Sequence, residues 1–102
     1  MVSRLLALGL MLTAASAFGA THTVSIEAMQ FSPASLTVKR GDVVAWANKD
    51  LVPHTATSAT GKAFDSKSIA PGASWRMTAK KPGRYEYVCT LHPTMKAVLV
   101  VE

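Results

Sequence analysis

The sequence predicts an all-β domain folded as a Greek-key β-sandwich of about seven or eight short strands. Short runs of alternating apolar and polar residues recur along the chain, and turn residues separate them. After residue 20 no stretch combines the length, the period and the capping residues of a helix. The 102 residues, 49% of them hydrophobic, suffice for one small domain.

Six segments alternate in the manner of half-buried strands. They comprise residues 21–28, 35–39, 43–48, 73–79, 85–89 and 97–101. Turns are expected around Pro33, Gly41, Pro71 and Gly83, since proline gives no hydrogen bond to a strand ladder and glycine tolerates positive φ. A further short strand is expected within residues 64–70.

Several side chains are expected in the core. The segment around Trp46 is the most apolar, so it should lie centrally in a sheet with Trp46 as an anchor. Phe31 should fill the core beside it. Met29 is expected to fill a core gap, although its thioether could also serve as a ligand. Tyr85 and Tyr87 share one face, and the Tyr85 hydroxyl should bond nearby backbone, as in the tyrosine corners of β-sandwiches.

The first 17 residues are expected to be a secretory signal peptide. Arg4 supplies a positive charge, residues 5–14 are almost wholly apolar, and Ala15-Ser16-Ala17 fits a small-x-small cleavage site. An uncleaved anchor or a buried helix fits less well, because a membrane-spanning helix needs about 20 apolar residues. Cleavage after Ala17, or a few residues later, would leave residues 18–102 as a single exported, periplasmic domain without a membrane span.

Cys89 is the only cysteine of the chain. Exported proteins normally pair their cysteines, so an unpaired thiol there is dimer-forming, reactive or occupied. Metal ligation would hold it deprotonated and shielded. A buried, inert thiol is the alternative.

The residues after Cys89 favour metal ligation. His92 and Met95 follow with two residues between each successive pair, so a thiolate, an imidazole and a thioether share one short loop between two strands. Blue-copper sites hold the ion with two imidazoles and a thiolate in a trigonal plane and a long axial thioether. The loop offers three of these four ligands.

His54 offers the missing imidazole. It follows Pro53, which stiffens the approach, so the ring can be held whether or not metal is present. His22 lies near the start of the first strand, where the chain frays. It is expected to be idle, although it could bind metal adventitiously.

These residues, in this order, resemble the copper site of the cupredoxins, the type 1 blue-copper proteins, and most closely their amicyanin and plastocyanin-like members. The two-residue gaps on either side of His92 are those of the amicyanin branch. The resemblance covers essentially all of the chain after the leader. It includes Phe31-x-Pro33, residues 36–48, residues 83–89 and the closing Val100-Val101-Glu102.

The resemblance implies a site and a function. His54, Cys89 and His92 would form the trigonal plane and Met95 the axial bond to one copper ion, Cu(I) or Cu(II), in a monomeric electron carrier that is not an enzyme. Thr55 would tie the two ligand loops together, a task that an asparagine often performs in the family.

Docking with redox partners is implied as well. Apolar residues would ring His92 and suit brief contact with another protein. They are Leu51, Val52, Leu91 and Pro93. An amine dehydrogenase as electron donor and a c-type cytochrome as acceptor would be the partners implied.

Other chemistries fit the residues less well. Zinc gains little from a thioether, and iron–sulfur clusters usually need four cysteines. Cys89 and His92 could form a nucleophile–base pair, but no third group is apparent that would orient the base. The lysines are scattered rather than interleaved with aromatics, so nucleic acid is not expected. The formal net charge of +5, of which Arg4 contributes one, favours solubility and weak steering toward an acidic partner.

Two other functions stay open on the sequence. The same fold could deliver copper rather than electrons in the periplasm. A metal-free sandwich that binds another protein, with Cys89 as a core thiol, is the second.

Overall fold

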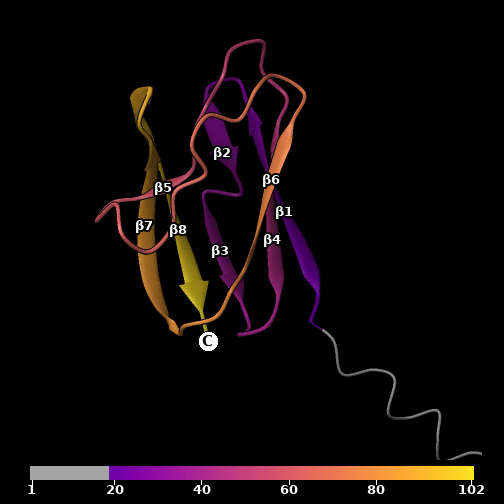
Figure 1. The fold of residues 1–102 in the computed structure, drawn as a ribbon, viewed down its shortest axis with the longest axis vertical. Coiled ribbons are helices and arrows are strands. Elements are labelled where there is room, and N and C mark those ends of the chain that lie inside the picture. The colour runs from indigo at the N-terminus through magenta and orange to yellow at the C-terminus, as the bar shows by residue number, and fades with distance from the viewer. Residues whose placement is uncertain (1–18) are drawn as a thin grey trace, which may run out of the picture.

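The computed structural model describes residues 19–102, so the predicted leader, residues 1–17, lies outside the described residues. Within residues 19–102 the chain forms eight strands and no helix (Figure 1). The strands are β1 (Thr21–Glu27), β2 (Gln30–Ser32), β3 (Ser35–Val38), β4 (Val43–Asn48), β5 (Thr57–Ser58), β6 (Ser74–Thr78), β7 (Gly83–Cys89) and β8 (His92–Val101). Accordingly, this part of the chain contains no helix long and apolar enough to cross a membrane.

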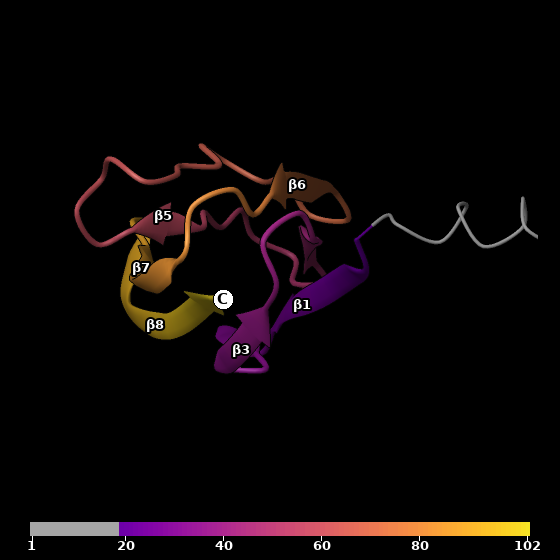
Figure 2. The same ribbon diagram turned by 90° about the horizontal axis from the view of Figure 1, so that it is seen from below.

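The strands form two four-stranded mixed sheets, and the predicted β-sandwich is confirmed. One sheet has the order β2-β1-β4-β6 and the other β3-β8-β7-β5. The pairs β1–β4 and β3–β8 are parallel, while the remaining pairs are antiparallel. Figure 2 shows β1 and β6 on one side of the molecule and β7 and β8 on the other.

The core lies between the two sheets and is rich in aromatic rings. Trp46 is fully buried on β4, which lies between β1 and β6, so its predicted central position is confirmed. Its ring centroid is 5.4 Å from that of Trp75 and 5.6 Å from those of Phe64 and Tyr87. Phe31 is buried as predicted. Such offset and edge-on contacts stabilise a core beyond the burial of apolar area.

The hairpin of β7 and β8 differs in extent from the prediction. The sequence predicted a loop from Cys89 to Met95 before the last strand, but β8 begins at His92 and pairs it with Cys89. Pro93 is tolerated there because it lies at the beginning of the strand. A bulge between Val88 and Cys89 shifts the register. Both ends of the ligand segment are thereby fixed to the sheet.

Two smaller predictions were wrong and one was confirmed. Residues 64–70 form no strand, because their backbone pairs with residues 54–57 only through isolated bridges. The two-residue strand β5 was not predicted. Met29 does not fill the core: it lies in the turn between β1 and β2, and 42% of its surface is exposed. The Tyr85 hydroxyl donates to the Lys81 carbonyl over 2.6 Å, as predicted.

Candidate metal centre

The four predicted ligands lie at one end of the sandwich. His54 follows β4, Cys89 ends β7, and His92 and Met95 belong to the first half of β8. His54 and Cys89 are fully buried, 3% of Met95 is exposed, and His92 is half-buried. Three donors are therefore shielded from water, and one ring reaches the surface.

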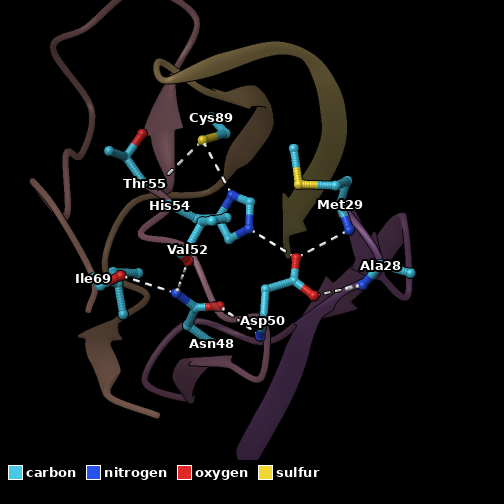
Figure 3. Close-up of polar contacts among 9 residues, drawn as sticks. All are labelled: Ala28, Met29, Asn48, Asp50, Val52, His54, Thr55, Ile69 and Cys89. Carbon is cyan, nitrogen blue, oxygen red and sulfur yellow. Dashed lines mark hydrogen bonds and ion pairs between the residues drawn. The ribbon is translucent and has the colours of Figure 1, made fainter. Parts of the chain in front are cut away.

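His54 and Cys89 meet directly. The Nδ1 atom of His54 lies 3.7 Å from the Cys89 Sγ atom (Figure 3). A first-row metal ion bound at about 2.3 Å to a thiolate and about 2.0 Å to an imidazole, with an angle between tetrahedral and trigonal, would separate the two donors by roughly 3.5–3.7 Å. The observed separation fits two ligands of one ion.

His92 lies next to this pair without completing a cluster. Its ring centroid is 4.9 Å from that of His54, and the two rings are inclined by 58°. Among residues 19–102 no three His, Cys, Asp or Glu side chains are arranged closely enough to hold a metal ion. His54 and Cys89 thus lie close enough to share an ion, and His92 lies beside them.

Asp50 holds the other side of the His54 ring. Its Oδ2 atom lies 2.8 Å from His54 Nε2. Because a carboxylate only accepts hydrogen bonds, this contact places the ring proton on Nε2 and leaves the Nδ1 lone pair facing Cys89. Carboxylates that orient ligating histidines in this way are common around metal sites.

The same carboxylate also binds a strained turn. Ala28 and Met29 connect β1 to β2 with φ values of 54° and 60°, a region that side chains other than glycine rarely adopt. The backbone N–H groups of both residues donate to Asp50, over 2.7 and 3.0 Å. The Met29 N–H is the main cause that holds the pKa of Asp50 below its ordinary value of 3.8, and the bonds from His54 and Ala28 add to it.

Asn48 fixes the loop that carries Asp50 and His54. Its amide nitrogen donates to the carbonyls of Val52 and Ile69, and its amide oxygen accepts from the Asp50 N–H. Figure 3 shows this network beneath the His54 ring. Since Asn48 is buried, its bonds set the loop conformation without competition from water.

Thr55 ties the two ligand segments together, as the resemblance implied. Its N–H donates to Cys89 Sγ over 3.3 Å, and its hydroxyl oxygen accepts the N–H of Thr90 over 2.9 Å. Both bonds therefore join the segment that carries His54 to the segment that carries Cys89 and His92.

Exposed apolar side chains cluster in the segments that carry the ligands. Leu51 is 93% exposed, Val52 41% and Leu91 51%. Leu51 and Val52 lie two or three residues before His54, and Leu91 directly precedes His92. We call these three side chains the apolar rim. Large exposed apolar groups mark interaction sites when they lie together.

The sequence did not reveal Asp50 or Asn48 as parts of this region. An acidic residue four positions before a candidate ligand was a usable signal, because ligating histidines commonly bond to carboxylates through the second ring nitrogen. Asn48 offered no such signal, since its contacts depend on how the loops fold together. The sequence allowed Met29 as a spare ligand, but its contact in this region is that of its backbone N–H with Asp50.

Comparisons with known proteins agree with the fold and the residue pattern. The family model described as a cupredoxin-like domain matches residues 2–101. Amicyanin of Paracoccus versutus is 31% identical over an alignment of 83 positions that covers 78% of this chain and 63% of that protein. The chain thus spans somewhat less than two thirds of this relative's length.

Solved structures are similar as well. A variant of amicyanin in its Cu(I) form is 30% identical and superposes with a TM-score of 0.72 over 80% of this chain and 82% of that one. The copper-containing nitrite reductase of Thermus scotoductus SA-01 gives 0.75 at 28% identity, but only 22% of that chain is covered, so the likeness concerns one domain of it. The resemblance found in the sequence is confirmed: the chain belongs to the cupredoxin-like family.

Proposed function

We propose that this protein is a blue-copper electron carrier whose ligands are His54, Cys89, His92 and Met95. One observation carries the proposal: two soft or borderline donors, a buried thiol sulfur and a buried imidazole nitrogen, face each other at 3.7 Å. The half-buried His92 and the buried Met95, at the start of the paired strand, would supply the remaining imidazole and the axial thioether.

The residues around the pair suit one-electron transfer. Bound copper would supply a couple between two oxidation states. Asp50 fixes the His54 ring, and the N–H of Thr55 donates to the Cys89 sulfur. Ligands held in advance by such bonds need little rearrangement when an electron moves. Four protein ligands leave no open position for a substrate, so the proposal is a carrier and not an enzyme.

The apolar rim would form the docking surface for redox partners. Leu91 is adjacent to His92 in sequence, and Leu51 and Val52 lie between Asp50 and His54. A partner that covers these side chains would approach the half-buried His92 ring. By analogy with amicyanin, the partners would be an amine dehydrogenase as donor and a c-type cytochrome as acceptor.

Residues 1–17 would direct this carrier to the periplasm as a cleaved leader, with residues 18–102 as one monomeric domain. The small-x-small site at Ala15-Ser16-Ala17 supports this proposal. Mass spectrometry of the protein secreted by a bacterial host gives the cleavage site directly. Recovery of an uncleaved, membrane-bound chain would contradict it.

Visible spectroscopy of the purified protein with one equivalent of Cu(II) tests the copper site. We expect a strong thiolate-to-copper band that a reductant bleaches reversibly. The Met95→Ala variant should shift or weaken the band. The matched control Met77→Ala removes a methionine from β6 and should leave the band unchanged.

Two other outcomes of this experiment would favour the other functions considered for this fold. Tight Cu(I) binding without a visible band, with rapid transfer to a chelator, would favour copper delivery. No metal binding at all would leave a sandwich that recognises another protein.

A further inference from the structure

A groove opens between the edges of the two sheets, where β6 faces the beginning of β7. It encloses about 920 Å³ and is lined by side chains from β6, β7 and the segments that flank them. β6 and β7 belong to different sheets, so residues from both sheets line the groove. None of the four predicted ligands lines it.

The floor of the groove is aromatic. Phe64 is buried, and its ring centroid is 6.3 Å from those of both Trp75 and Tyr85. Trp75, Met77 and Tyr85 are only half-buried, so parts of their apolar surfaces face the opening. Aromatic and methionine side chains provide large contact areas at interfaces.

The rim is basic. Lys62, Lys80, Lys81 and Arg84 line the groove against a single carboxylate, that of Asp65. Arg84 is paired with Glu86 at 2.8 Å, and Asp65 with Lys67 at 3.4 Å. Within residues 19–102 the ammonium groups of Lys62, Lys80 and Lys81 form no ion pair. A local positive field thus remains above the aromatic floor.

The strand on one side of the groove has a free edge. β6 is the last strand of its sheet and pairs only with β4 in the described part of the chain. An edge strand presents unpaired N–H and C=O groups that can pair with an added strand. Extended peptides bind sheet edges in this way, and their alternate side chains enter neighbouring pockets.

We propose that this groove, bounded by β6, Lys80, Lys81 and Tyr85, binds an extended acidic segment of a protein partner. Backbone pairing along β6 would hold the segment, its apolar side chains would contact Trp75 and Met77, and its carboxylates would face the lysines. The unpaired edge favours a polypeptide over other polyanions, which have no backbone N–H and C=O groups to pair with it.

The groove lies at the opposite end of β7 from the candidate copper ligands. Tyr85 lies near the beginning of β7, and Cys89 ends the same strand about 13 Å further along. Figure 1 shows β7 running from this region toward the hairpin at the opposite end. A partner anchored in the groove therefore leaves the apolar rim and His92 accessible. Only the identification of that partner as a redox protein rests on the proposed function.

Isothermal titration calorimetry with an acetylated heptapeptide of alternating glutamate and valine tests the binding, using the purified copper-free protein. We expect saturable binding that weakens with added salt and perturbs the Trp75 indole signal in NMR spectra. The double variant Lys80→Glu/Lys81→Glu should weaken it at least about tenfold. A peptide with serine in place of valine should also bind less well, because it lacks apolar side chains for the floor.

The matched control is Lys39→Glu/Arg40→Glu, which changes the net charge equally at exposed residues that neither line the groove nor belong to β6. Its affinity should stay within about twofold of the unaltered protein. Equal losses in both double variants, or no peptide binding at all, would overturn the proposal. Binding of a single-stranded oligonucleotide or an anionic vesicle in place of the peptide would overturn it too. The visible band of the copper-loaded protein should be the same in all variants, so failure of the groove is separable from failure of the copper site.

Discussion

The molecule contains two aspartate–histidine pairs of nearly the same construction. Asp50 accepts two backbone N–H groups and lies 2.8 Å from His54 Nε2. Asp42 accepts the N–H groups of Ala20 and Lys39 and lies 2.9 Å from His22 Nε2. The pairs differ in what the second ring nitrogen meets. That of His54 faces a buried thiol, whereas in residues 19–102 that of His22 makes no hydrogen bond, and 28% of its side chain is exposed.

The comparison shows that an aspartate–histidine pair can serve a purely structural role, without any metal ligand nearby in the described part of the chain. In both pairs the carboxylate joins segments that are distant in sequence, by bonding their N–H groups. Only at His54 does a sulfur donor approach the free ring nitrogen, which is the arrangement that the proposed copper site needs. Four predictions test this contrast, in descending order of expected effect.

Removal of the thiol should make the two pairs alike. Cys89→Ser is expected to abolish the visible copper band completely, because serine offers no thiolate for charge transfer. His22→Ala should leave the band unchanged. Absorption spectra of both variants with one equivalent of Cu(II) make the comparison. A Cys89→Ser variant that keeps the band would refute the assignment of Cys89.

The two proposed ligand histidines should respond differently to replacement. Both His54→Gly and His92→Gly are expected to lose the band. Added imidazole should restore it in His92→Gly, whose ring position reaches the surface, but not in His54→Gly, whose ring is fully buried. Titration of imidazole into each copper-loaded variant measures the recovery. Equal recovery in both would show that burial does not distinguish them.

Loss of the orienting carboxylate should weaken copper binding without abolishing it. Asp50→Ala is expected to lower copper affinity about 10- to 100-fold, as is usual for partners of ligating histidines. Asp42→Ala, its counterpart in the other pair, should leave the affinity unchanged. Competition with a chelator of known affinity measures both. Similar affinities in the two variants would mean that Asp50 does not position His54.

Acid should reduce the stabilisation of the fold by both aspartate–histidine pairs to a similar extent. This effect should be smaller than those of the substitutions above. The N–H of Lys39 is the main cause that lowers the pKa of Asp42, as that of Met29 does for Asp50. Because the folded-state values lie below the ordinary 3.8, the stabilisation is complete above that pH and is lost as the pH falls through the folded-state values.

Thermal unfolding of the copper-free protein between about pH 5 and pH 2 measures this loss. Asp42→Asn and Asp50→Asn should each flatten the dependence on pH. If neither variant differs from the unaltered protein, other carboxylates account for the acid sensitivity.

The parts of the fold that depend on local pattern were predictable. Alternation defined β1, β3, β4, β6 and β7 closely, and the apolar density around Trp46 indicated its central strand. β5 and the bridges at Asp65 and Ile69 were not predictable, because two-residue pairings are determined by tertiary contacts rather than by periodicity. The predicted loop around His92 became strand because pairing with Cys89 extends the hairpin.

For the candidate site, residue type and spacing predicted a set of donors, of which the structure brings His54, Cys89 and His92 close together. His54 was inferred from Pro53 and from the donors elsewhere in the chain, and its Nδ1 atom does lie next to Cys89. The role of Asp50 required knowledge of the ring orientation. Its bonds to Ala28 and Met29 join segments more than twenty residues apart, which no local pattern encodes.

The turn at Ala28 and Met29 has a practical consequence for spectroscopy. Its two amide protons rest on the same carboxylate that holds the His54 ring. Any change in charge on that ring, such as loading with metal, should alter the polarisation of these N–H bonds and hence their chemical shifts. The two amides would thus report binding of the diamagnetic, colourless Cu(I) ion, for which absorption gives no signal.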